Sequence, residues 1–549
     1  MNSNTNRLKN FALTLALGTA LVGAFVYAAA PDKPADKPVQ GAGKYFKPDE
    51  MQTDGSVGTE SGRVNYTAVA GTLVIHAKDW DDVPVPKDAD KDQKEAAAKN
   101  PDAETSMFYA AYFKKGANAG QRPIMFLFNG GPGSATVWLH MGAFGPRRVV
   151  TSDDSHTPAA PYNVVDNAYS LLDAADLVFI DAPGAGFSRV AGKDKDKAFW
   201  GIDEDAGAFS EFINQFLTKY SRWNSPKYIF GESYGTTRAA VLSNMLASNY
   251  AIDLNGVVML SQILNFDMSA DGPQVNPGVN LPYQLALPTY AASAWYHNKL
   301  PGQKPADLRK FLGEVQHFAM GDYAMALQAG AALNDQQRGT IAQKLHNYTG
   351  LRVDYILKAD LRIDGGMFEQ NLQDTNEMTT GRLDTRFSGP SLDPLDKEAD
   401  YDPQSAAISS AYISAFNDYA RTALKYGDGR KYFLFAPLKD WDFKHTQPGS
   451  NQALQSSPNV MPDLAVAMKT NPNLKVMLNA GFYDLATPYY EGIYEMRQLP
   501  IPRKLQANIE YKQYESGHMV YAHEESLKNL HDNVAAFIRR TDNVRGEGE

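Results

Sequence analysis

The sequence contains no cysteine in its 549 residues. This absence excludes disulfide bonds, and it also excludes a lipid-modified cysteine at the amino terminus. A chain of this length can be stable without disulfides, because a large core buries enough apolar surface by itself. The length also indicates a core domain with a large insertion or a second domain.

Metal-binding motifs and basic blocks are missing as well, and each absence excludes a class of function. The ten histidines form no His-x-x-x-His motif, there are no cysteine pairs, and no acidic cluster has metal-ligand spacing. We therefore expect no metal and no other cofactor. The net charge of −10 is spread along the chain without a basic block, which argues against nucleic acid as a partner.

The amino terminus has the pattern of a secretory signal peptide. Two basic residues precede the apolar run Phe11–Tyr27, which ends in Ala28-Ala29-Ala30 and a Pro/Lys/Asp-rich segment. We predict a signal peptide over 1–30, cleaved after Ala28 or Ala30; an uncleaved membrane anchor is the alternative. Cleavage would leave no stable membrane association. Export without disulfides is typical of a bacterial periplasm or exterior, where we expect this protein.

The rest of the chain divides by composition into a sheet-forming core and an insertion. Residues 31–60 are rich in Pro, Lys, Asp and Gly, which predicts a tether. Apolar runs alternate with helical patterns over 61–264, and the same alternation resumes over 431–540. Between these parts, 265–430 is mainly helical in pattern and predicts a cap insertion that forms a pocket over the sheet. Residues 541–549 are expected to be a frayed tail.

Short runs, most of them largely apolar, mark the strands of the core. Strands that are buried on both faces have this pattern, so the fold class that we predict is α/β, with a mostly parallel sheet and helices on both faces. The runs before the insertion are Ile124–Phe128, Asp176–Ile180, Lys227–Phe230 and Gly256–Leu260, and Leu474–Leu478 and Ile509–Tyr514 follow it.

The segment Gly231-Glu232-Ser233-Tyr234-Gly235 lies between a short apolar run and a helical stretch. Strand, tight turn and helix in this order are the context of a nucleophile elbow, which presents a serine hydroxyl at the end of a sheet. The two glycines remove Cβ atoms that would clash at such a turn. Gly-x-Ser-x-Gly alone is also compatible with an ordinary turn, so the role of Ser233 depends on partners elsewhere.

Asp484 and His518 provide those partners. A serine hydroxyl needs a histidine to take its proton and a carboxylate to hold that histidine in the right tautomer. In α/β-hydrolases the acid follows the serine in the chain, and the histidine follows the acid. Asp484 and His518 each lie in a loop after a predicted core strand, at the edge where catalytic loops gather. The order predicts a triad with Ser233 as nucleophile.

Four blocks of the sequence resemble the serine carboxypeptidase family of α/β-hydrolases. They are Asn129-Gly130-Gly131-Pro132-Gly133, Asp181–Ser188, Gly231–Gly235 and Gly517-His518-Met519-Val520. The resemblance implies an enzyme that releases the C-terminal amino acid from a peptide substrate by means of the triad. It implies an oxyanion hole formed by the backbone N–H groups of Gly131 and Tyr234. It also implies substrate contacts from Asn129, Gly130, Glu232 and Met519.

The sequence departs from the family where the substrate's free carboxylate would bind. The family uses the Asn of the first block, the Glu before the nucleophile, and a second Glu shortly before a Gly-Pro pair. Asn129 and Glu232 match, but Ala143 stands at the second Glu, and Ser134 stands where a cysteine is usual. Arginines could supply positive charge instead, although exposure or structural pairing is the simpler interpretation of each; they are Arg147, Arg148 and Arg238.

Together these observations predict an exported serine carboxypeptidase that acts through an acyl-enzyme. The same triad could serve an esterase, an acyltransferase or another peptidase, because fold and triad do not fix the substrate. A third reading is a non-enzymatic exported binding protein that retains the fold, and the intact triad argues against it. The sequence does not indicate an oligomeric state.

Overall fold

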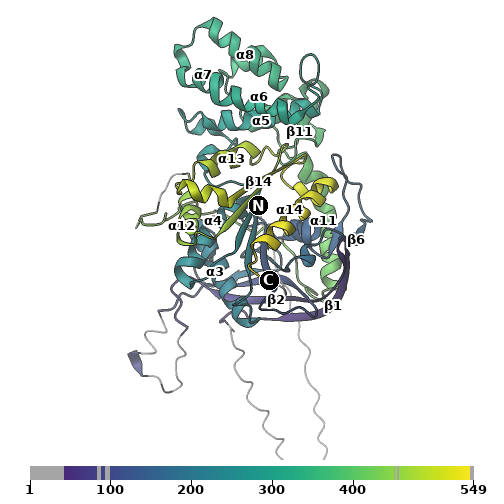
Figure 1. The fold of residues 1–549 in the computed structure, drawn as a ribbon, viewed down its shortest axis with the longest axis vertical. Helices are drawn as coiled ribbons and strands as arrows, with labels where there is room; N and C mark the ends of the chain where they lie inside the picture. The colour runs from purple at the N-terminus through teal and green to yellow at the C-terminus, as the bar shows by residue number, and fades with distance from the viewer. Residues whose placement is uncertain are drawn as a thin grey trace, which may run out of the picture. The chain divides into compact units, whose positions relative to one another are not determined.

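The centre of the fold is a ten-stranded sheet with the order β1-β2-β3-β7-β4-β9-β10-β13-β14, with β8 paired to β3 beside this path (Figure 1). The computed structural model describes residues 43–82, 88, 90–92, 99–450, 452–453 and 457–544, all within one compact unit, Gly41–Glu549. The predicted signal peptide lies outside the described residues. The strands of this sheet are β1 (Glu50–Thr59), β2 (Gly62–His76), β3 (Glu104–Lys114), β4 (Ile124–Phe128), β7 (Asp176–Ile180), β8 (Arg189–Ala191), β9 (Lys227–Glu232), β10 (Gly256–Leu260), β13 (Lys475–Gly481) and β14 (Ile509–Tyr514).

The half of the sheet from β7 to β14 is parallel throughout. Strands β4, β7 and β10 are buried at every residue, as expected where helices cover both faces. Helices α3 (Ile202–Lys219), α4 (Tyr234–Tyr250) and α12 (Met461–Thr470) pack on one side, and α11 (Pro403–Thr422) and α14 (Glu524–Thr541) lie on the other (Figure 1). The predicted α/β-hydrolase architecture is therefore confirmed.

The other half of the sheet is antiparallel. The prediction of a tether over 31–60 is wrong for its last part, because β1 occupies Glu50–Thr59. Strand β1 pairs with β2 along its whole length, although nearly all of its side chains are exposed or half-buried. Backbone hydrogen bonds form such an edge strand without an apolar pattern, which is why composition alone missed it. The chain is attached even earlier, because Glu104 accepts hydrogen bonds from the backbone N–H groups of Lys44 and Phe46 at 2.8 and 2.7 Å.

Helices make up most of the insertion that follows β10, as predicted from the sequence pattern. None of the helices in the part of the chain that the structure describes is long and apolar enough to cross a membrane. The helices of the insertion are α5 (Leu281–Tyr296), α6 (Leu308–Phe318), α7 (Ala324–Ala329), α8 (Asp335–Thr349), α9 (Val353–Lys358) and α10 (Gly365–Asn371); the short strands β11 (Met378–Thr380) and β12 (Ser388–Pro390) come next.

The predicted carboxyl boundary of the cap, at residue 430, lies too far along the chain. Helix α11 packs on the core, where the ring of Tyr412 lies 5.0 Å from that of Trp138 and the ring of Phe416 lies 5.3 Å from that of His140. Aromatic side chains at helical spacing predict a buried face, but they do not say which part of the protein covers it. The remaining strands and α-helices of the core are β5 (Arg147–Val149), β6 (Val164–Asp166), α2 (Lys195–Phe199) and α13 (Tyr489–Arg497).

Candidate active site

Ser233 lies at a strained turn between β9 and α4. Its backbone has φ +61° and ψ −132°. Residues other than glycine rarely adopt a positive φ of this size. The neighbouring glycines are required by space, since a Cβ atom at Gly231 would lie 2.1 Å from the carbonyl oxygen of Gly235. The turn therefore has the geometry of a nucleophile elbow, with the serine at the carboxyl end of a central strand.

Asp484 and His518 lie in the loops that follow β13 and β14, which come after β10 in the order of the sheet. His518 Nδ1 is 2.8 Å from Asp484 Oδ2. The carboxylate also accepts hydrogen bonds from the backbone N–H and the hydroxyl of Thr487, at 3.0 and 2.8 Å. Because the carboxylate only accepts, Nδ1 carries the proton and Nε2 is left as the acceptor. The structure thus brings the acid and the histidine together in the tautomer that a general base needs.

Burial and charge act in opposite directions on His518. Burial lowers the pKa of the imidazole, but the charges of Asp484 and Glu232 and the hydrogen bond to Asp484 outweigh it, so the pKa is raised overall. A raised pKa favours the imidazolium that forms when the histidine takes the serine proton. Within the described residues no hydrogen bond joins the Ser233 hydroxyl to His518; such contacts often tighten only when substrate binds.

The glycine loop after β4 lies directly against the start of α4. A Cβ atom at Gly130 would lie 2.5 Å from the backbone nitrogen of Tyr234. Tyr234 is the first residue of the helix, so its N–H has no partner within the helix. Gly131 has φ +106°, which suits glycine and turns the loop beside the elbow. The two backbone donors predicted for an oxyanion hole, Gly131 and Tyr234, therefore belong to segments in contact.

Glu232 is a buried acid immediately before the nucleophile. Its carboxylate accepts hydrogen bonds from the hydroxyl of Tyr521 at 3.1 and 2.9 Å. Burial raises the pKa of Glu232 to about 7, against the opposing effects of His518 and of hydrogen bonds from Tyr521 and Asn129. Asn129 is held in place through its side-chain oxygen, which accepts from the N–H of Leu139 at 3.1 Å. The predicted substrate-binding residues Asn129 and Glu232 are therefore in contact with each other. Met519, also predicted, is buried in the turn after His518.

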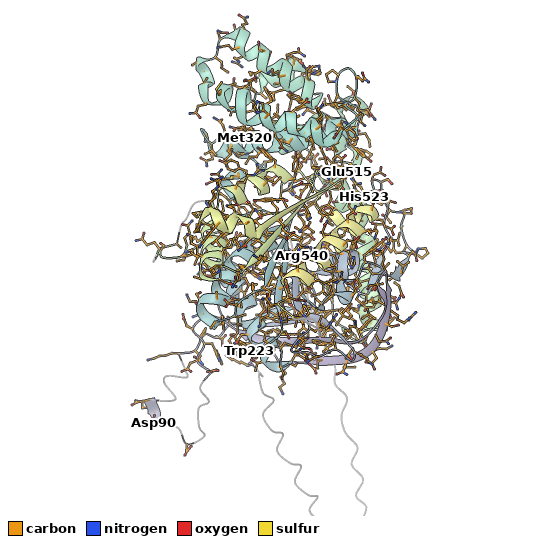
Figure 2. The ribbon with its side chains drawn as sticks, viewed as in Figure 1. Asp90, Trp223, Met320, Glu515, His523 and Arg540 are labelled. Carbon is orange, nitrogen blue, oxygen red and sulfur yellow. The ribbon has the colours of Figure 1, made fainter. Side chains whose placement is uncertain are left out.

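Tyr521 was not predicted, although it stands only three residues after His518, directly after the block that resembles the family. Nothing in its sequence position reveals that its hydroxyl reaches Glu232, because the two residues are 289 positions apart. Figure 2 labels Glu515 and His523, which bracket the loop with His518 at the end of the sheet nearest to the insertion. Tyr521 lies in a short helical turn of this same segment, Val520–Ala522.

The three candidate arginines differ in their surroundings. Arg238 is buried and paired with Asp205, and Arg147 pairs with Asp166, so both have structural partners. Arg148 Nη2 lies 3.0 Å from Glu524, while its Nε is buried and has no hydrogen-bond partner among the described residues. Arg148 lines a cavity of about 210 Å³ that Tyr412 and Tyr521 also line.

A segment of the insertion fastens both catalytic loops, and sequence reasoning missed it. The carbonyl oxygen of Leu383 accepts from the N–H of His518 at 2.7 Å, and Asp384 Oδ2 accepts from the N–H of Gly517 at 3.1 Å. On the other side, Thr385 N donates to the carbonyl of Tyr483 at 2.9 Å. Residues 382–386, which we call the clamp segment, therefore tie the loop of the acid to the loop of the histidine. Its polar, irregular sequence carries no signal for this role.

No group of histidine and acidic residues in the described part of the chain could hold a metal ion. The site is built instead from a serine, an imidazole, two carboxyl groups and backbone donors. This arrangement can carry out acyl transfer by a serine nucleophile next to a buried, titratable acid.

Comparison with known proteins gives the family. Residues 98–535 match the family model described as serine carboxypeptidase. The pheromone-processing carboxypeptidase KEX1 of Cryptococcus gattii is 30% identical over 138 residues, covering 24% of this chain and 19% of that protein. Serine carboxypeptidase ctsa-3.2 of Caenorhabditis elegans is 26% identical over 155 residues, covering 27% and 28%. Serine carboxypeptidase-like 9 of Arabidopsis thaliana is 24% identical over 172 residues, covering 30% and 38%.

Two solved structures illustrate the likeness of the chain to proteins of known structure. Proline iminopeptidase of Mycobacterium smegmatis is 14% identical, with a TM-score of 0.33 and coverage of 80% of this chain and 96% of that one. The peroxisomal α/β-hydrolase Lpx1 of Saccharomyces cerevisiae is 9% identical, with a TM-score of 0.33 and coverage of 87% and 92%.

The family match spans most of the chain, so the protein belongs to the serine carboxypeptidase family. The predicted resemblance is confirmed at this level. The chain spans between about a fifth and two fifths of the length of the curated relatives named above.

Proposed function

We propose that the protein is an exported serine carboxypeptidase that hydrolyses the last peptide bond of a substrate with a free C-terminus. The observation that carries the proposal is Glu232, a buried acid with a pKa of about 7 directly beside the nucleophile. A carboxyl group in a dry site repels a substrate carboxylate when ionised and donates a hydrogen bond to it when protonated. An acid of this kind has a clear use in an enzyme that recognises a C-terminal carboxylate.

The proposed mechanism assigns each step to one member of the triad or to a backbone donor beside it. The Ser233 oxygen attacks the scissile carbonyl carbon while its proton passes to His518 Nε2, and Asp484 holds the imidazolium through Nδ1–H. The backbone N–H groups of Gly131 and Tyr234 receive the oxyanion. The C–N bond then breaks, and His518 protonates the leaving amine. A water molecule, deprotonated by His518, next hydrolyses the Ser233 ester and restores the free serine.

The substitution at Ala143 favours one alternative, a serine esterase, acyltransferase or other peptidase without specificity for a free carboxylate. A matched set of substrates separates the two functions: a peptide with a free C-terminus, the same peptide with a C-terminal amide, and an ester of the same acyl group. The carboxypeptidase should cleave the free peptide and the ester but leave the amide nearly intact. Equal cleavage of free and amidated peptides would favour the alternative. A Ser233→Ala control assigns all three activities to this site.

Export is supported by the basic, apolar and small-residue pattern of 1–30. Mass spectrometry of the protein recovered outside the cytoplasm should find an amino terminus at Ala29 or Pro31, as cleavage after Ala28 or Ala30 requires. An intact Met1 on membrane-bound material would instead identify an anchor.

A further inference from the structure

Residues 433–445 form an irregular stretch between α11 and α12, which we call the strap. Its first part is hydrogen-bonded to the glycine loop that follows β4. The N–H of Ala135 donates to the carbonyl of Leu434 at 2.9 Å, and the N–H of Ala436 donates to the carbonyl of Gly133 at 2.7 Å. The strap therefore supports the loop that carries the first of the two predicted oxyanion donors.

The second part of the strap reaches the other predicted donor. The indole ring of Trp441 lies 5.3 Å from the ring of Tyr234, edge to face, and Tyr234 is only 2% exposed. Such a contact fixes how two aromatic rings lie against each other. One segment thus contacts both parts of the chain that supply the predicted donors, the glycine loop and the first residue of α4.

His445 anchors the carboxyl end of the strap to two helices. Its Nδ1 lies 2.6 Å from Asp203 in α3, and its Nε2 lies 2.8 Å from Asp463 in α12, with the imidazole only 2% exposed. Asp463 also accepts a hydrogen bond from the side chain of Asn244 in α4, at 3.0 Å. Because ionised carboxylates only accept hydrogen bonds, both ring nitrogens carry protons and the imidazole is charged.

We propose that the strap sets the separation of the two oxyanion donors, and that His445 is the positioning residue that holds the strap in place. The inference rests on the proposed acyl transfer, with Gly131 and Tyr234 as donors, and goes beyond it by naming what aligns them. Donors of this kind must be fixed in advance, and they stabilise the transition state more than the bound substrate. A loosened strap should therefore lower kcat and leave KM nearly unchanged, for peptide and ester alike.

The charge of His445 makes the anchor sensitive to alkaline pH. Burial lowers the pKa of His445, but the hydrogen bonds and charges of Asp203 and Asp463 outweigh it and raise the pKa from 6.5 to about 9. The other charged groups nearby are Glu204 in α3 and Asp442 and Lys444 in the strap. Because the pKa is raised on folding, the anchor is complete below about pH 6.5 and is lost as the pH rises through about 9.

The decisive variant is His445→Gln, which removes the charge and keeps a polar side chain. A shift of about 1 Å in one donor should reduce kcat for the ester roughly 10²-fold, with KM nearly unchanged. In wild type, kcat for the ester should fall as the pH rises through about 9, and the variant should lack this step.

His531→Gln is the matched control. His531 is also buried between two aspartates, with Nε2 3.2 Å from Asp173 and Nδ1 2.9 Å from Asp532. Asp173 lies just before β7, at the opposite end of the sheet from the catalytic loops. This variant should lower the unfolding temperature without lowering kcat of the folded enzyme.

A thionoester with the same acyl group reports on the oxyanion donors separately, because sulfur is a weak hydrogen-bond acceptor. The ratio of ester rate to thionoester rate should shrink in His445→Gln by about the same factor as kcat, and a merely structural role would leave it unchanged. Trp441→Leu keeps the anchor but removes the ring beside Tyr234, so it tests the strap even if His445→Gln does not fold. It should shrink the same ratio.

An unchanged ratio in the folded strap variants, or an equal loss of kcat in His531→Gln, overturns the role of the strap. In either case the proposed acyl transfer stands, provided that ester hydrolysis still depends on Ser233. Ester hydrolysis that survives Ser233→Ala would instead refute the acyl transfer, and the role of the strap with it.

Discussion

The active site has two halves, and they differ in how closely they follow the family pattern. The acyl-transfer half, Ser233, His518 and Asp484, has every residue in the expected order, at the ends of β9, β14 and β13, with the 2.8 Å contact between imidazole and carboxylate. The carboxylate half keeps Asn129 and Glu232 but lacks the second acid. Under the proposed function, the residues that would make and break the acyl bond are all retained, while the set that would select the substrate's end lacks one acid.

The halves also differ in how they are held. Backbone hydrogen bonds from the clamp segment and from Thr487 fix the loops of the acid and the histidine. Glu232, in contrast, is fixed by its place on β9 and by two side chains, the phenol of Tyr521 in a turn that follows the histidine loop and the amide of Asn129. Changes in the first half should therefore affect every substrate, and changes in the second half should affect only substrates with a free carboxylate.

The largest effect is expected from Ser233→Ala. The variant should fold normally and lose hydrolysis of both peptide and ester by several orders of magnitude, because oxyanion stabilisation and binding alone retain only about 10³–10⁴-fold over water. Initial rates on both substrates, beside a thermal unfolding curve, measure this. Near-normal turnover of either substrate by a folded variant would show that Ser233 is not the nucleophile.

Asp484→Asn should come next, with a loss of about 10⁴-fold in kcat for both substrates. The amide can donate to Nδ1, which favours the wrong tautomer of His518 and leaves Nε2 protonated. The shape of the side chain is nearly unchanged, so the protein should fold. Single-turnover rates separate this loss in chemistry from a change in binding. A loss confined to the peptide would place Asp484 in the carboxylate half instead.

Asp384→Asn tests the clamp segment, and a smaller loss is expected. Asp384 is fully buried and bridges Arg386 and the N–H of Gly517. A weaker clamp should let His518 shift, and a displacement of about 1 Å can reduce the rate roughly 10²-fold. Peptide and ester rates should fall together, in kcat more than in KM.

Asp176→Asn is the matched control for this variant. Asp176 is also buried and paired with an arginine, Arg222 at 2.6 Å, but it begins a strand and so lies at the opposite end of the sheet from the catalytic loops. It should lower the unfolding temperature without lowering kcat of the folded enzyme. If Asp384→Asn behaves in the same way, the clamp segment stabilises the fold but does not position His518.

The sequence predicted the acyl-transfer half more fully than its surroundings, for physical reasons. Buried parallel strands such as β4 and β7 are apolar at almost every residue, so their ends could be located from the sequence, and the triad residues with them. Strand β1 is polar and exposed, and its pairing depends on backbone groups that the sequence pattern does not show. Tyr521 and the clamp segment act through contacts between residues far apart in the chain, and local pattern carries no information about those.

The smallest and most selective effect is expected from Glu232→Gln. Burial raises the pKa of Glu232 to about 7, so the acid is protonated below this pH and donates to the substrate carboxylate; above it, the ionised acid repels that carboxylate. Wild-type kcat/KM for a free peptide should therefore fall about tenfold per pH unit above neutrality, while ester hydrolysis continues. The glutamine donates a hydrogen bond at every pH, so the variant should lose this fall and cleave the peptide at a nearly constant rate through the same range. The acidic limb of the ester profile should move to lower pH, because the Glu232 charge that raises the pKa of His518 is removed. Peptide and ester profiles that stay parallel in wild type would mean that Glu232 does not receive the carboxylate, and the two halves of the site would then share one function.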